Sequence, residues 1–405
     1  MGKNRKLNIL QISTYDNKGG AAKVAWMLKQ ELEKHGHTTS MFVKHKLSTA
    51  SNVYQIPNNF LQRLLSVAFA SDLDFFQSNH ILQTEQYRKA DIIHCHNLHG
   101  YYFNLTTLQK MAQEKTVIWT LHDEWAITPH CAYSLNGSLK SGFYQCSSRK
   151  LYPEILWPNE KYLQWRKKKV YKNARLEIVV PCHWLEQKVK ASILKNQRIS
   201  LIYYGVDAAI FKKYPKKEAR QKLSLPVDKK IITFLVQGGK NNPWKGWEYA
   251  QEIISNYYRN KDILLLCIGG NLNDQGLSNE NIKYIPFIFD KSLLAQYYSS
   301  SDVFLLTSLA DNFPNTVLEA MACGTPVVSF DVGGVKEAVV HNKNGYIAKY
   351  KDCNDLTSGV DYILSLSSKK LKSLSQNSIK RIKNNFTLTT MTKNYIDLYQ
   401  SLIKI

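Results

Sequence analysis

Short apolar runs alternate with longer segments of helical periodicity along almost the whole chain. In the first half the apolar runs are "LNILQIS", "TTSMFVK", "DIIHCHN", "TVIWTLH" and "LEIVVPC". In the second half they are "KIITFLV", "DILLLCIG", "IKYIPFI", "DVFLLTS", "TPVVSF" and "GYIAKY". Strands that alternate with helices are typical of βαβ units in a parallel sheet. Two such series predict an α/β protein with two Rossmann-like, doubly wound parallel-sheet domains.

A charged, turn-rich stretch at residues 203–230 separates the two series. The length of 405 residues exceeds what one hydrophobic core usually supports, which also favours two domains. We place the first domain at 1–205 and the second at 206–385. Residues 386–405 have helical spacing, and we expect this last helix to pack back across the domain boundary.

The net charge of +22 indicates an anionic partner such as nucleic acid, an acidic membrane face or a phosphorylated substrate. Lysines cluster at 165–173 and 211–222, and residues 60–70 have apolar residues at helical spacing. This combination is typical of a surface that contacts an anionic membrane. It is also compatible with an ordinary solvated face and an ordinary core helix. We find no secretory signal and no apolar run long enough to span a bilayer. We therefore expect a cytoplasmic protein, at the inner face of the membrane if it docks there.

The seven cysteines follow no regular framework, which favours reduced thiols over a disulfide scaffold. Cys131 and Cys146, with His130 nearby, are also the residue types of a structural zinc site, but no CxxC supplies further ligands. His94 and His96 fall on one face of a strand and lack further ligands as well. We predict no metal site.

In open parallel sheets, ligands bind beyond the carboxyl ends of the strands, so the loops there are the candidates for a binding site. Gly19 and Gly20 end the first strand and open a helix whose free N–H groups suit an anion or a sugar. The dinucleotide pattern GxGxxG is absent. His122 and Asp123 follow "VIWTL". A histidine at this place can donate a hydrogen bond to a sugar hydroxyl. It is equally often a buried side chain whose hydrogen bonds are made within the protein.

Two further loops lie in the second half. Lys240 and Lys245 flank a turn after "KIITFLV" and could clamp a diphosphate, although no Walker pattern occurs. In "ADNFPNTVLEAMACG", we expect Asn315 to cap a helix whose first turn has unpaired N–H groups. Glu319 lies on that helix and Asp311 precedes it, so both can accept from polyol hydroxyls. We expect Thr316, Val317 and Leu318 to form that first turn. Asn315, Thr316 and Val317 are among the residues that we expect to bind the donor.

The stretch "ADNFPNTVLEAMACGTPVVSFDVGG" resembles the E-x7-E donor motif of family-4 retaining glycosyltransferases of GT-B fold. The likeness extends over nearly the whole chain, through "TLHDEW", "VVPCHWL", "YYGVDAAIF" and "WKGWEYA". It is strongest to enzymes that assemble capsule, exopolysaccharide or lipopolysaccharide. The resemblance implies an acceptor-side first domain and a donor-binding second domain around a central cleft.

The resemblance also implies roles for individual residues. Glu319 would bind the ribose of the donor, and Asp311, where the family has its first Glu, would face the transferred sugar. Lys245 would contact the diphosphate, with Lys240 in place of the usual arginine; the loss of the arginine fork alters the phosphate geometry.

Five further residues, in three parts of the chain, match the family pattern. His122 corresponds to the histidine in the cleft of the family, and Gly19 with Gly20 to its first loop. Phe287 and Ile288 stand where the family packs the nucleotide base. The implied catalytic residues are thus His122, Asp311, Lys245 and Lys240.

We interpret the sequence as a metal-independent retaining hexosyltransferase that uses a UDP-sugar or GDP-sugar donor, needs no cofactor and does not bind nucleic acid. Its acceptor would be a glycan or lipid-linked saccharide in surface polysaccharide biosynthesis. Alternatives are another GT-B activity, such as a nucleotide-sugar epimerase or a phosphorylase, and a non-catalytic basic protein that binds anionic membrane or nucleic acid. A reaction that requires an acceptor indicates a transferase rather than an epimerase, and consumption of orthophosphate indicates a phosphorylase. Binding that weakens steeply with salt, without any sugar transfer, indicates the non-catalytic basic protein.

Overall fold

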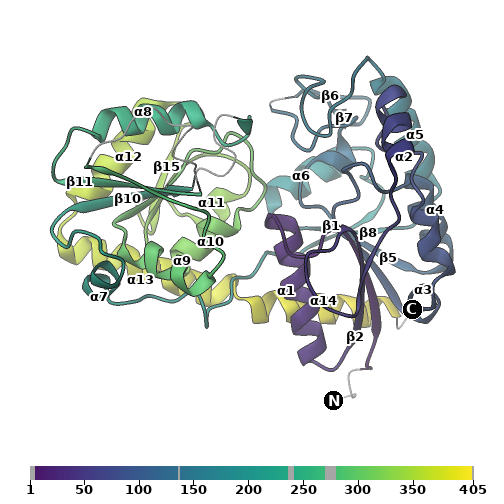
Figure 1. Ribbon diagram of the computed structural model, residues 1–405, viewed down its shortest axis with the longest axis horizontal. Helices are drawn as coiled ribbons and strands as arrows, with labels where there is room; N and C mark the ends of the chain where they lie inside the picture. Colours follow the sequence, from purple (N-terminus) through teal and green to yellow (C-terminus); the bar gives the residue numbers. More distant parts are fainter. Residues whose placement is uncertain (1–4, 136, 236–240, 270–279, 404–405) are drawn as a thin grey trace. The chain divides into compact units, whose positions relative to one another are not determined.

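The computed structural model describes residues 5–135, 137–235, 241–269 and 280–403. These residues form two compact units, one made of residues 1–203 and 389–405 and the other of residues 204–388. Each unit contains one parallel sheet with helices packed against it (Figure 1). The prediction of two doubly wound α/β domains is confirmed.

The first unit is built on a seven-stranded parallel sheet with the order β3-β2-β1-β4-β5-β8-β9. Its strands are β1 (Asn8–Tyr15), β2 (Thr38–His45), β3 (Val53–Gln55), β4 (Ile92–Cys95), β5 (Thr116–Thr120), β8 (Glu177–Val180) and β9 (Arg198–Leu201). The strand order reverses direction between β1 and β4, where Ile9 pairs with Ile92. This reversal is the switch point at which open α/β sheets bind ligands.

Helices cover this sheet, and one short hairpin stands apart from it. The helices are α1 (Gly20–Lys34), α2 (Phe60–Ala68), α3 (Glu85–Lys89), α4 (Leu105–Glu114), α5 (Glu160–Lys172), α6 (His183–Ala191) and α14 (Leu388–Ile403), with 3-10 turns η1 (Ser78–Gln83) and η2 (Trp125–Ile127). The hairpin joins β6 (Leu139–Lys140) to β7 (Phe143–Tyr144). Helix α2 starts with a capping box, because Asn59 accepts from the Gln62 N–H while the Gln62 side chain accepts from the Asn59 N–H.

The second unit is built on a six-stranded parallel sheet with the order β12-β11-β10-β13-β14-β15. Its strands are β10 (Lys230–Leu235), β11 (Ile263–Ile268), β12 (Ile282–Ile285), β13 (Val303–Leu306), β14 (Val327–Phe330) and β15 (Gly345–Ala348). Its helices are α7 (Lys216–Lys222), α8 (Trp247–Tyr257), α9 (Lys291–Ser300), α10 (Asn315–Ala322), α11 (Val335–Ala338), α12 (Cys353–Ser365) and α13 (Ser368–Asn385). Ile232 and Ile231 on adjacent positions of β10 belong to two different hydrophobic clusters, so both faces of the sheet are covered.

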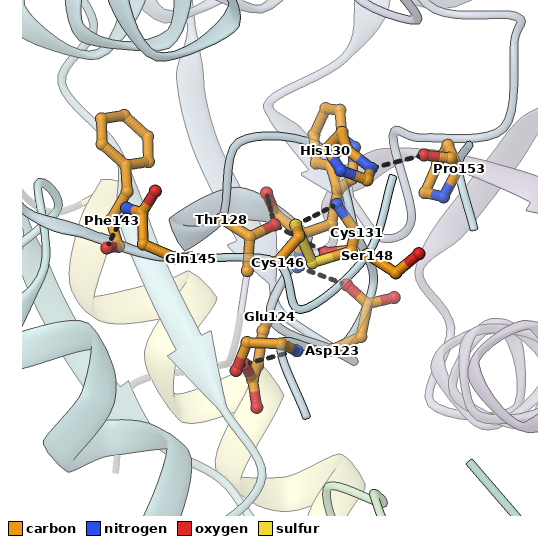
Figure 2. Close-up of a disulfide and its surroundings, with 12 residues drawn as sticks. Asp123, Glu124, Thr128, His130, Cys131, Phe143, Gln145, Cys146, Ser148 and Pro153 are labelled. Carbon is orange, nitrogen blue, oxygen red and sulfur yellow. Dashed lines mark hydrogen bonds between the residues drawn. A yellow bond between two sulfur atoms is a disulfide. The ribbon is translucent and has the colours of Figure 1, made fainter. Parts of the chain in front are cut away.

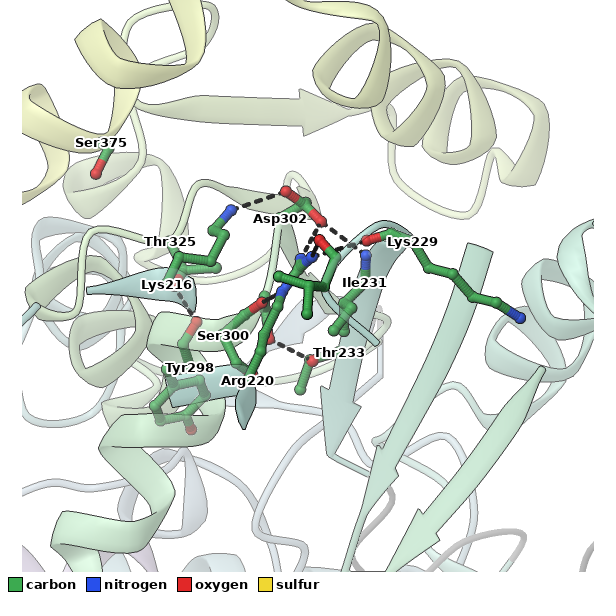
Figure 3. A network of polar contacts seen from close by, with 12 residues as sticks. Lys216, Arg220, Lys229, Ile231, Thr233, Tyr298, Ser300, Asp302, Thr325 and Ser375 are labelled. Carbon is green, nitrogen blue, oxygen red and sulfur yellow. Dashed lines mark hydrogen bonds and ion pairs between the residues drawn. The ribbon is translucent and has the colours of Figure 1, made fainter. Parts of the chain in front are cut away.

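The amino-terminal edge of the second sheet is held by a paired polar network (Figure 3). Asp302, just before β13, accepts from Lys216 at 2.7 Å and from Arg220 at 2.8 Å, and also from the Ile231 N–H at 2.7 Å. Burial favours the protonated carboxyl, but these three donors outweigh burial and keep the pKa of Asp302 below its usual value. The network therefore ties α7 to β10 and β13.

The sequence did not predict the hairpin strands β6 and β7, nor the sheet strands β3 and β9. Strands β3 and β9 each pair with only one neighbour, at the two ends of the first sheet. Val53–Gln55 is three residues long, and Arg198–Leu201 alternates charged and polar residues with apolar ones. Such short edge strands show little apolar signal, because their pairing is decided by the sheet that they join.

Candidate functional site

Lys245 and Asp311 meet at the carboxyl edge of the second sheet. The Lys245 ammonium donates to Asp311 Oδ2 at 2.8 Å. The backbone fixes both residues, since Thr307 donates to the Lys245 carbonyl at 2.9 Å and the Leu309 N–H donates to the Trp244 carbonyl at 2.7 Å. A lysine and a carboxylate far apart in the sequence are thus held together beside the ends of β10 and β13.

Two glycines allow this close packing. Gly246 precedes α8 with φ of 57°, and a Cβ there would lie 2.1 Å from the Thr307 carbonyl oxygen. Gly333 has φ of 53°, and a Cβ there would lie 1.9 Å from the Asp311 carbonyl oxygen. Because no larger side chain fits either position, the loop that carries Asp311 is clamped between the start of α8 and the turn after β14.

Helix α10 begins at Asn315, with Pro314 at the N-cap position and no side-chain cap. The prediction that Asn315 caps this helix is therefore wrong, because the fixed φ of Pro314 already sets the turn. Asn315 and Thr316 are half-buried and Val317 is buried. Glu319 accepts a hydrogen bond from the Tyr298 hydroxyl at 3.2 Å, one turn inside the helix. The amino end of α10 and the Lys245–Asp311 pair thus belong to neighbouring loops of one sheet edge.

The remaining residues predicted for the donor have different surroundings. Phe287 and Ile288 follow β12, also at the carboxyl edge. The ring of Phe287 contacts Phe289 at 4.9 Å between centroids, and Ile288 packs against the cluster that contains Leu266. Lys240 lies outside the described residues.

In the first unit, His122 follows β5 and belongs to a buried row of histidines. A hydrogen bond of 3.0 Å joins His122 Nε2 to His96 Nδ1, and the rings of His96 and His94 lie 4.2 Å apart. His94 is bonded to Thr120 and to Tyr399 of α14, each at 2.7 Å. Burial lowers the pKa of His122 to about 4 and that of His94 to about 3, so both rings are neutral at pH 7.

A second set of buried charges lies next to these histidines. His99 Nε2 and Asp123 Oδ2 are 2.7 Å apart, and Asp123 also accepts from the Trp125 N–H. Burial raises the pKa of Asp123, but the charge and hydrogen bond of His99 outweigh it and hold that pKa below its usual value. Burial raises the pKa of Asp72 to about 6 and lowers that of Lys167, although each attracts the other.

Sequence reasoning did not identify these charged residues as a group. His99 lies four residues after the end of β4, and this place beyond the carboxyl end of a strand was the available signal. Asp72 and Lys167 lie in a loop and a helix with no motif, so only tertiary packing brings them together.

The glycine turn of the first unit has the conformation that its sequence requires. Gly19 has φ of 92° and ψ of 165° at the N-cap of α1, and a Cβ there would meet no atom within 4 Å. Its backbone angles alone therefore require glycine. Gly19 and Gly20 are both exposed at the carboxyl end of β1.

Cys131 and Cys146 form a disulfide (Figure 2). The prediction of reduced thiols is wrong for this pair, because the loop after η2 folds back on the β6–β7 hairpin and brings them within bonding distance. His130 turns away from the sulfurs, and its Nδ1 is bonded to the Pro153 carbonyl oxygen at 2.8 Å. Cys95, Cys182, Cys267, Cys323 and Cys353 are free.

Residues 5–135, 137–235, 241–269 and 280–403 contain no group of three or more His, Cys, Asp or Glu side chains placed to hold a metal ion. Over the same ranges, no helix has both the length and the apolar character needed to cross a bilayer.

Two family models match successive parts of the chain. One, described as Glycosyltransferase Family 4, matches residues 18–210, and the other, described as Glycosyl transferases group 1, matches residues 215–381. The chain therefore belongs to the family-4 glycosyltransferases of GT-B fold, which confirms the resemblance.

Individual relatives agree with this assignment. The chain is 23% identical to the putative colanic acid biosynthesis glycosyl transferase WcaC of Escherichia coli, over 98% of this chain and 100% of WcaC. It is 26% identical to D-inositol 3-phosphate glycosyltransferase 2 of Catenulispora acidiphila, over 41% of this chain and 42% of that relative. The chain thus spans the whole of one relative and less than half of the other.

Solved structures show the same fold. Sucrose-phosphate synthase of Thermosynechococcus elongatus superposes with a TM-score of 0.72 at 18% identity, over 98% of this chain and 99% of that one. HepE of Anabaena, solved with UDP-glucose, superposes with a TM-score of 0.67 at 16% identity, over 98% and 100%. At these identities the likeness establishes the fold alone.

Proposed function

We propose that this glycosyltransferase moves a hexose from a nucleoside-diphosphate donor to a hydroxyl of a glycan or lipid-linked acceptor, with retention and without a metal ion. The second unit would bind the donor and the first unit the acceptor. The naming of WcaC for colanic acid biosynthesis supports a role in surface polysaccharide assembly. That the structure of HepE holds UDP-glucose supports a nucleotide-sugar donor.

One observation carries the proposal, the pairing of Lys245 with Asp311 beside the amino ends of α8 and α10. A leaving diphosphate needs positive charge where its negative charge develops. The lysine and the helix amino ends would supply that charge without a metal. Asp311 holds the ammonium in place, and Lys240 would add a second cation. The Glu319 carboxylate, fixed by Tyr298, would accept from the donor ribose.

Retention would follow from attack on the face that the diphosphate leaves. The bond from the anomeric carbon to the diphosphate oxygen breaks as the bond to the acceptor oxygen forms, and the acceptor proton passes to a phosphate oxygen. Neutral His122 would hold a sugar hydroxyl by a hydrogen bond, since burial lowers its pKa to about 4. Phe287 and Ile288 would face the base, and Gly19 with Gly20 would approach the sugar closely.

A screen of UDP- and GDP-sugars by thermal shift, followed by transfer assays with and without acceptor, tests the reaction. We expect one donor to raise the melting temperature and transfer to require the acceptor. Turnover without acceptor would instead indicate an epimerase, and dependence on orthophosphate a phosphorylase. NMR of the new glycosidic bond reports retention or inversion, and unchanged rates in EDTA would support metal independence.

Lys245→Ala tests the diphosphate contact. We expect kcat to fall roughly a hundredfold, because one preorganised charge donor is removed from the leaving group. The matched control is Lys261→Ala, which removes the same charge from an exposed lysine at the amino edge of the same sheet. Equal kcat for Lys245→Ala and the wild type would contradict this role.

We also propose that the first unit docks on an anionic membrane through an apolar ridge on α2 and the segment that leads into α5. Phe60, Leu61 and Leu64 of α2 are 80%, 60% and 50% exposed. Trp157 is exposed as well, and its indole N–H donates to the Ala68 carbonyl at 3.0 Å, which joins the two parts of the ridge. Arg63 is exposed on α2 itself, and Lys168 and Lys169 are exposed on α5.

Vesicle sedimentation tests the docking. We expect the protein to bind vesicles that contain phosphatidylglycerol and to bind neutral vesicles weakly, because aromatic insertion needs the added attraction to anionic lipid. Phe60→Ser with Leu61→Ser should abolish binding, whereas Val227→Ser, an exposed apolar residue of the second unit, should not. Equal binding to neutral and anionic vesicles, or equal effects of both variants, would contradict the docking surface.

A further inference from the structure

The first unit contains an open pocket of about 420 Å³ that differs from the buried histidine row. Its walls come from five parts of the unit, namely the end of β1, the end of β2, helix α2, the loop after β4 and the loop after β7. The residues that line it are Tyr15, Lys44, Arg63, Gly100, Tyr101, Lys150, Tyr152 and Glu154. We refer to it as the tyrosine–lysine pocket.

The pocket lies where an open α/β sheet is expected to bind a ligand. Tyr15 is the last residue of β1, Lys44 is near the end of β2, and Gly100 follows β4. All three strands are parallel, and the strand order reverses between β1 and β4. The pocket thus occupies the carboxyl edge of the sheet at its topological switch point.

The pocket has an excess of positive charge. Lys44, Arg63 and Lys150 face one carboxylate, Glu154, which leaves a net formal charge of +2. None of the three cations has an ion-pair partner in the part of the chain that the structure describes. Lys44 is held against the wall by a 2.7 Å hydrogen bond to the Gly100 carbonyl. Burial and the nearby charge of Arg63 lower the pKa of Lys44, as expected for cations gathered without an anion.

The walls are preorganised. Tyr101 has φ of 62°, an uncommon value for a tyrosine, and its backbone is fixed because Asn58 donates to its carbonyl at 2.8 Å. Its hydroxyl donates to the Glu154 carbonyl at 2.8 Å. A Cβ at Gly100 would lie 2.6 Å from the Tyr152 hydroxyl, so glycine is needed for Tyr152 to lie against this turn. Residues in unfavourable backbone conformations cluster at sites where they position groups for a ligand.

We propose that the tyrosine–lysine pocket binds the phosphate or diphosphate group of a phosphorylated sugar that serves as the acceptor. The net charge of +2 matches the charge of about −2 on a phosphate ester better than the single charge of a carboxylate. Arg63 offers the planar fork that binds phosphate oxygens in pairs, and the lysines act as point charges. The three tyrosines offer ring faces and hydroxyls to the attached sugar. The inference rests on the proposed function, because it names the acceptor class of that reaction.

The pocket is connected to the predicted catalytic region of the same unit. Tyr152 contacts the ring of His99 with 5.6 Å between centroids. His99 is bonded to Asp123, which adjoins His122 in the chain. An acceptor anchored by its phosphate in the pocket would therefore place its sugar toward His122.

The phosphate could belong to a free sugar phosphate or to a lipid-linked sugar diphosphate. Arg63 lies on α2, the helix that also carries exposed Phe60 and Leu64, and Glu154 is two residues before exposed Leu156. The pocket and the apolar ridge are therefore adjacent in the fold. The chemistry of the anionic group is the same for both sources, and only the experiment separates them.

Calorimetric titration of the full chain with glucose 1-phosphate, glucose and a farnesyl diphosphate-linked glucose in detergent tests the proposal. We expect both phosphorylated compounds to bind at least tenfold more tightly than glucose, and the tighter of the two identifies the source. Arg63→Gln with Lys150→Gln should weaken this binding roughly a hundredfold. Both side chains are exposed, so the variant should fold. Glu154→Gln should tighten binding two- to threefold, because it removes the opposing charge.

The matched control is Lys161→Gln with Lys172→Gln, which removes two exposed charges from α5 outside the pocket. Equal weakening by the control pair, or no preference for phosphate over glucose, would overturn the proposal. Donor binding by thermal shift is measured on the same variants. If the Arg63→Gln, Lys150→Gln variant loses phosphate binding and keeps donor binding, the result supports the pocket. If the wild type binds phosphate in the pocket but binds no nucleotide sugar, the result refutes only the proposed function.

Discussion

Each unit contains a buried polar network, and the two networks lie at opposite kinds of sheet edge. In the second unit, Asp302 lies at the amino edge, and both of its carboxylate oxygens accept from donors on α7 or β10. In the first unit, His99, Asp123 and Asp72 lie in loops near the carboxyl edge. Among the described residues, His99 Nδ1, His96 Nε2 and Asp72 Oδ1 are buried without a hydrogen-bond partner.

The networks also differ in protonation. The donors around Asp302 hold its pKa low, so the network keeps one charge state across neutral pH. Burial raises the pKa of Asp72 to about 6 and lowers that of Lys167 to about 7, so both pKa values lie close to neutral pH. A fully paired network stabilises a fold, whereas unpaired buried groups with shifted pKa values are typical of sites that bind or react. In this protein the network at the amino edge of a sheet thus stabilises the fold, whereas the network at the carboxyl edge keeps groups available to bind or react.

The largest expected effect is on the stability of the second unit. Asp302→Ala leaves Arg220 and Lys216 without their partner, and loss of one partner of a buried ion pair costs about 3–5 kcal/mol. Hydrogen exchange of the β10 and β13 amides in increasing urea measures this loss. The control Asp331→Ala breaks an exposed ion pair with Lys336 and should cost no more than about 1 kcal/mol. Similar losses in both variants would remove the structural role of the Asp302 network.

The next effect is on the loop that carries the site of the first unit. Cys131→Ser with Cys146→Ser opens a covalent loop of 15 residues, which should cost about 3 kcal/mol through the greater freedom of the unfolded chain. Hydrogen exchange of β4 and β5 amides reports the loss, while β10 and β13 amides should not change. Equal destabilisation of both sheets would show that the disulfide is not a local constraint.

Acid should destabilise the first unit selectively. Burial lowers the pKa of His94 to about 3 and of His122 to about 4, and that of His96 well below its usual value. Below pH 6.5 the unfolded state therefore binds three more protons at these histidines, so stability falls as pH falls. Below pH 6 the raised pKa of Asp72 opposes this by one proton, so these four groups together should cost about 3 kcal/mol of stability per pH unit.

Urea unfolding at pH 6 and pH 5 measures the acid effect. The second unit is an internal control, because His341 is the one histidine within residues 204–388. Exchange of its sheet amides should therefore change less over this range. A first unit that is equally stable at both pH values would contradict the burial of neutral histidines.

The smallest effect is on turnover through a positioning residue. His99→Asn removes the charge that holds the Asp123 pKa low, so kcat should fall about tenfold and the acid limb of the pH profile should move to higher pH. The control His183→Asn removes an exposed histidine paired with Glu186 and should leave the profile unchanged. A fall in kcat with an unmoved acid limb would indicate a merely structural role for His99.

Much of the fold was determined by the sequence itself. The apolar runs identified β1, β2, β4, β5 and β8 and all six strands of the second sheet. Central strands such as β11 are easy to identify because strands buried on both faces are continuously apolar. Loops such as Gly19–Gly20 and the stretch from Asp311 to Glu319 were found because special backbone angles and helix starts need particular residue types. The motif order was also sufficient to identify the family.

Tertiary structure decided which of these loops meet. Lys245 and Asp311 are 66 residues apart, and only the packing of Gly246 and Gly333 against neighbouring carbonyls brings their side chains together. Lys44, Arg63 and Lys150 carry no motif, yet the parallel sheet gathers them at one edge. Local patterns fix strands and turns because these depend on neighbouring residues, whereas a site depends on contacts between residues distant in the chain, which one sequence read in order does not display.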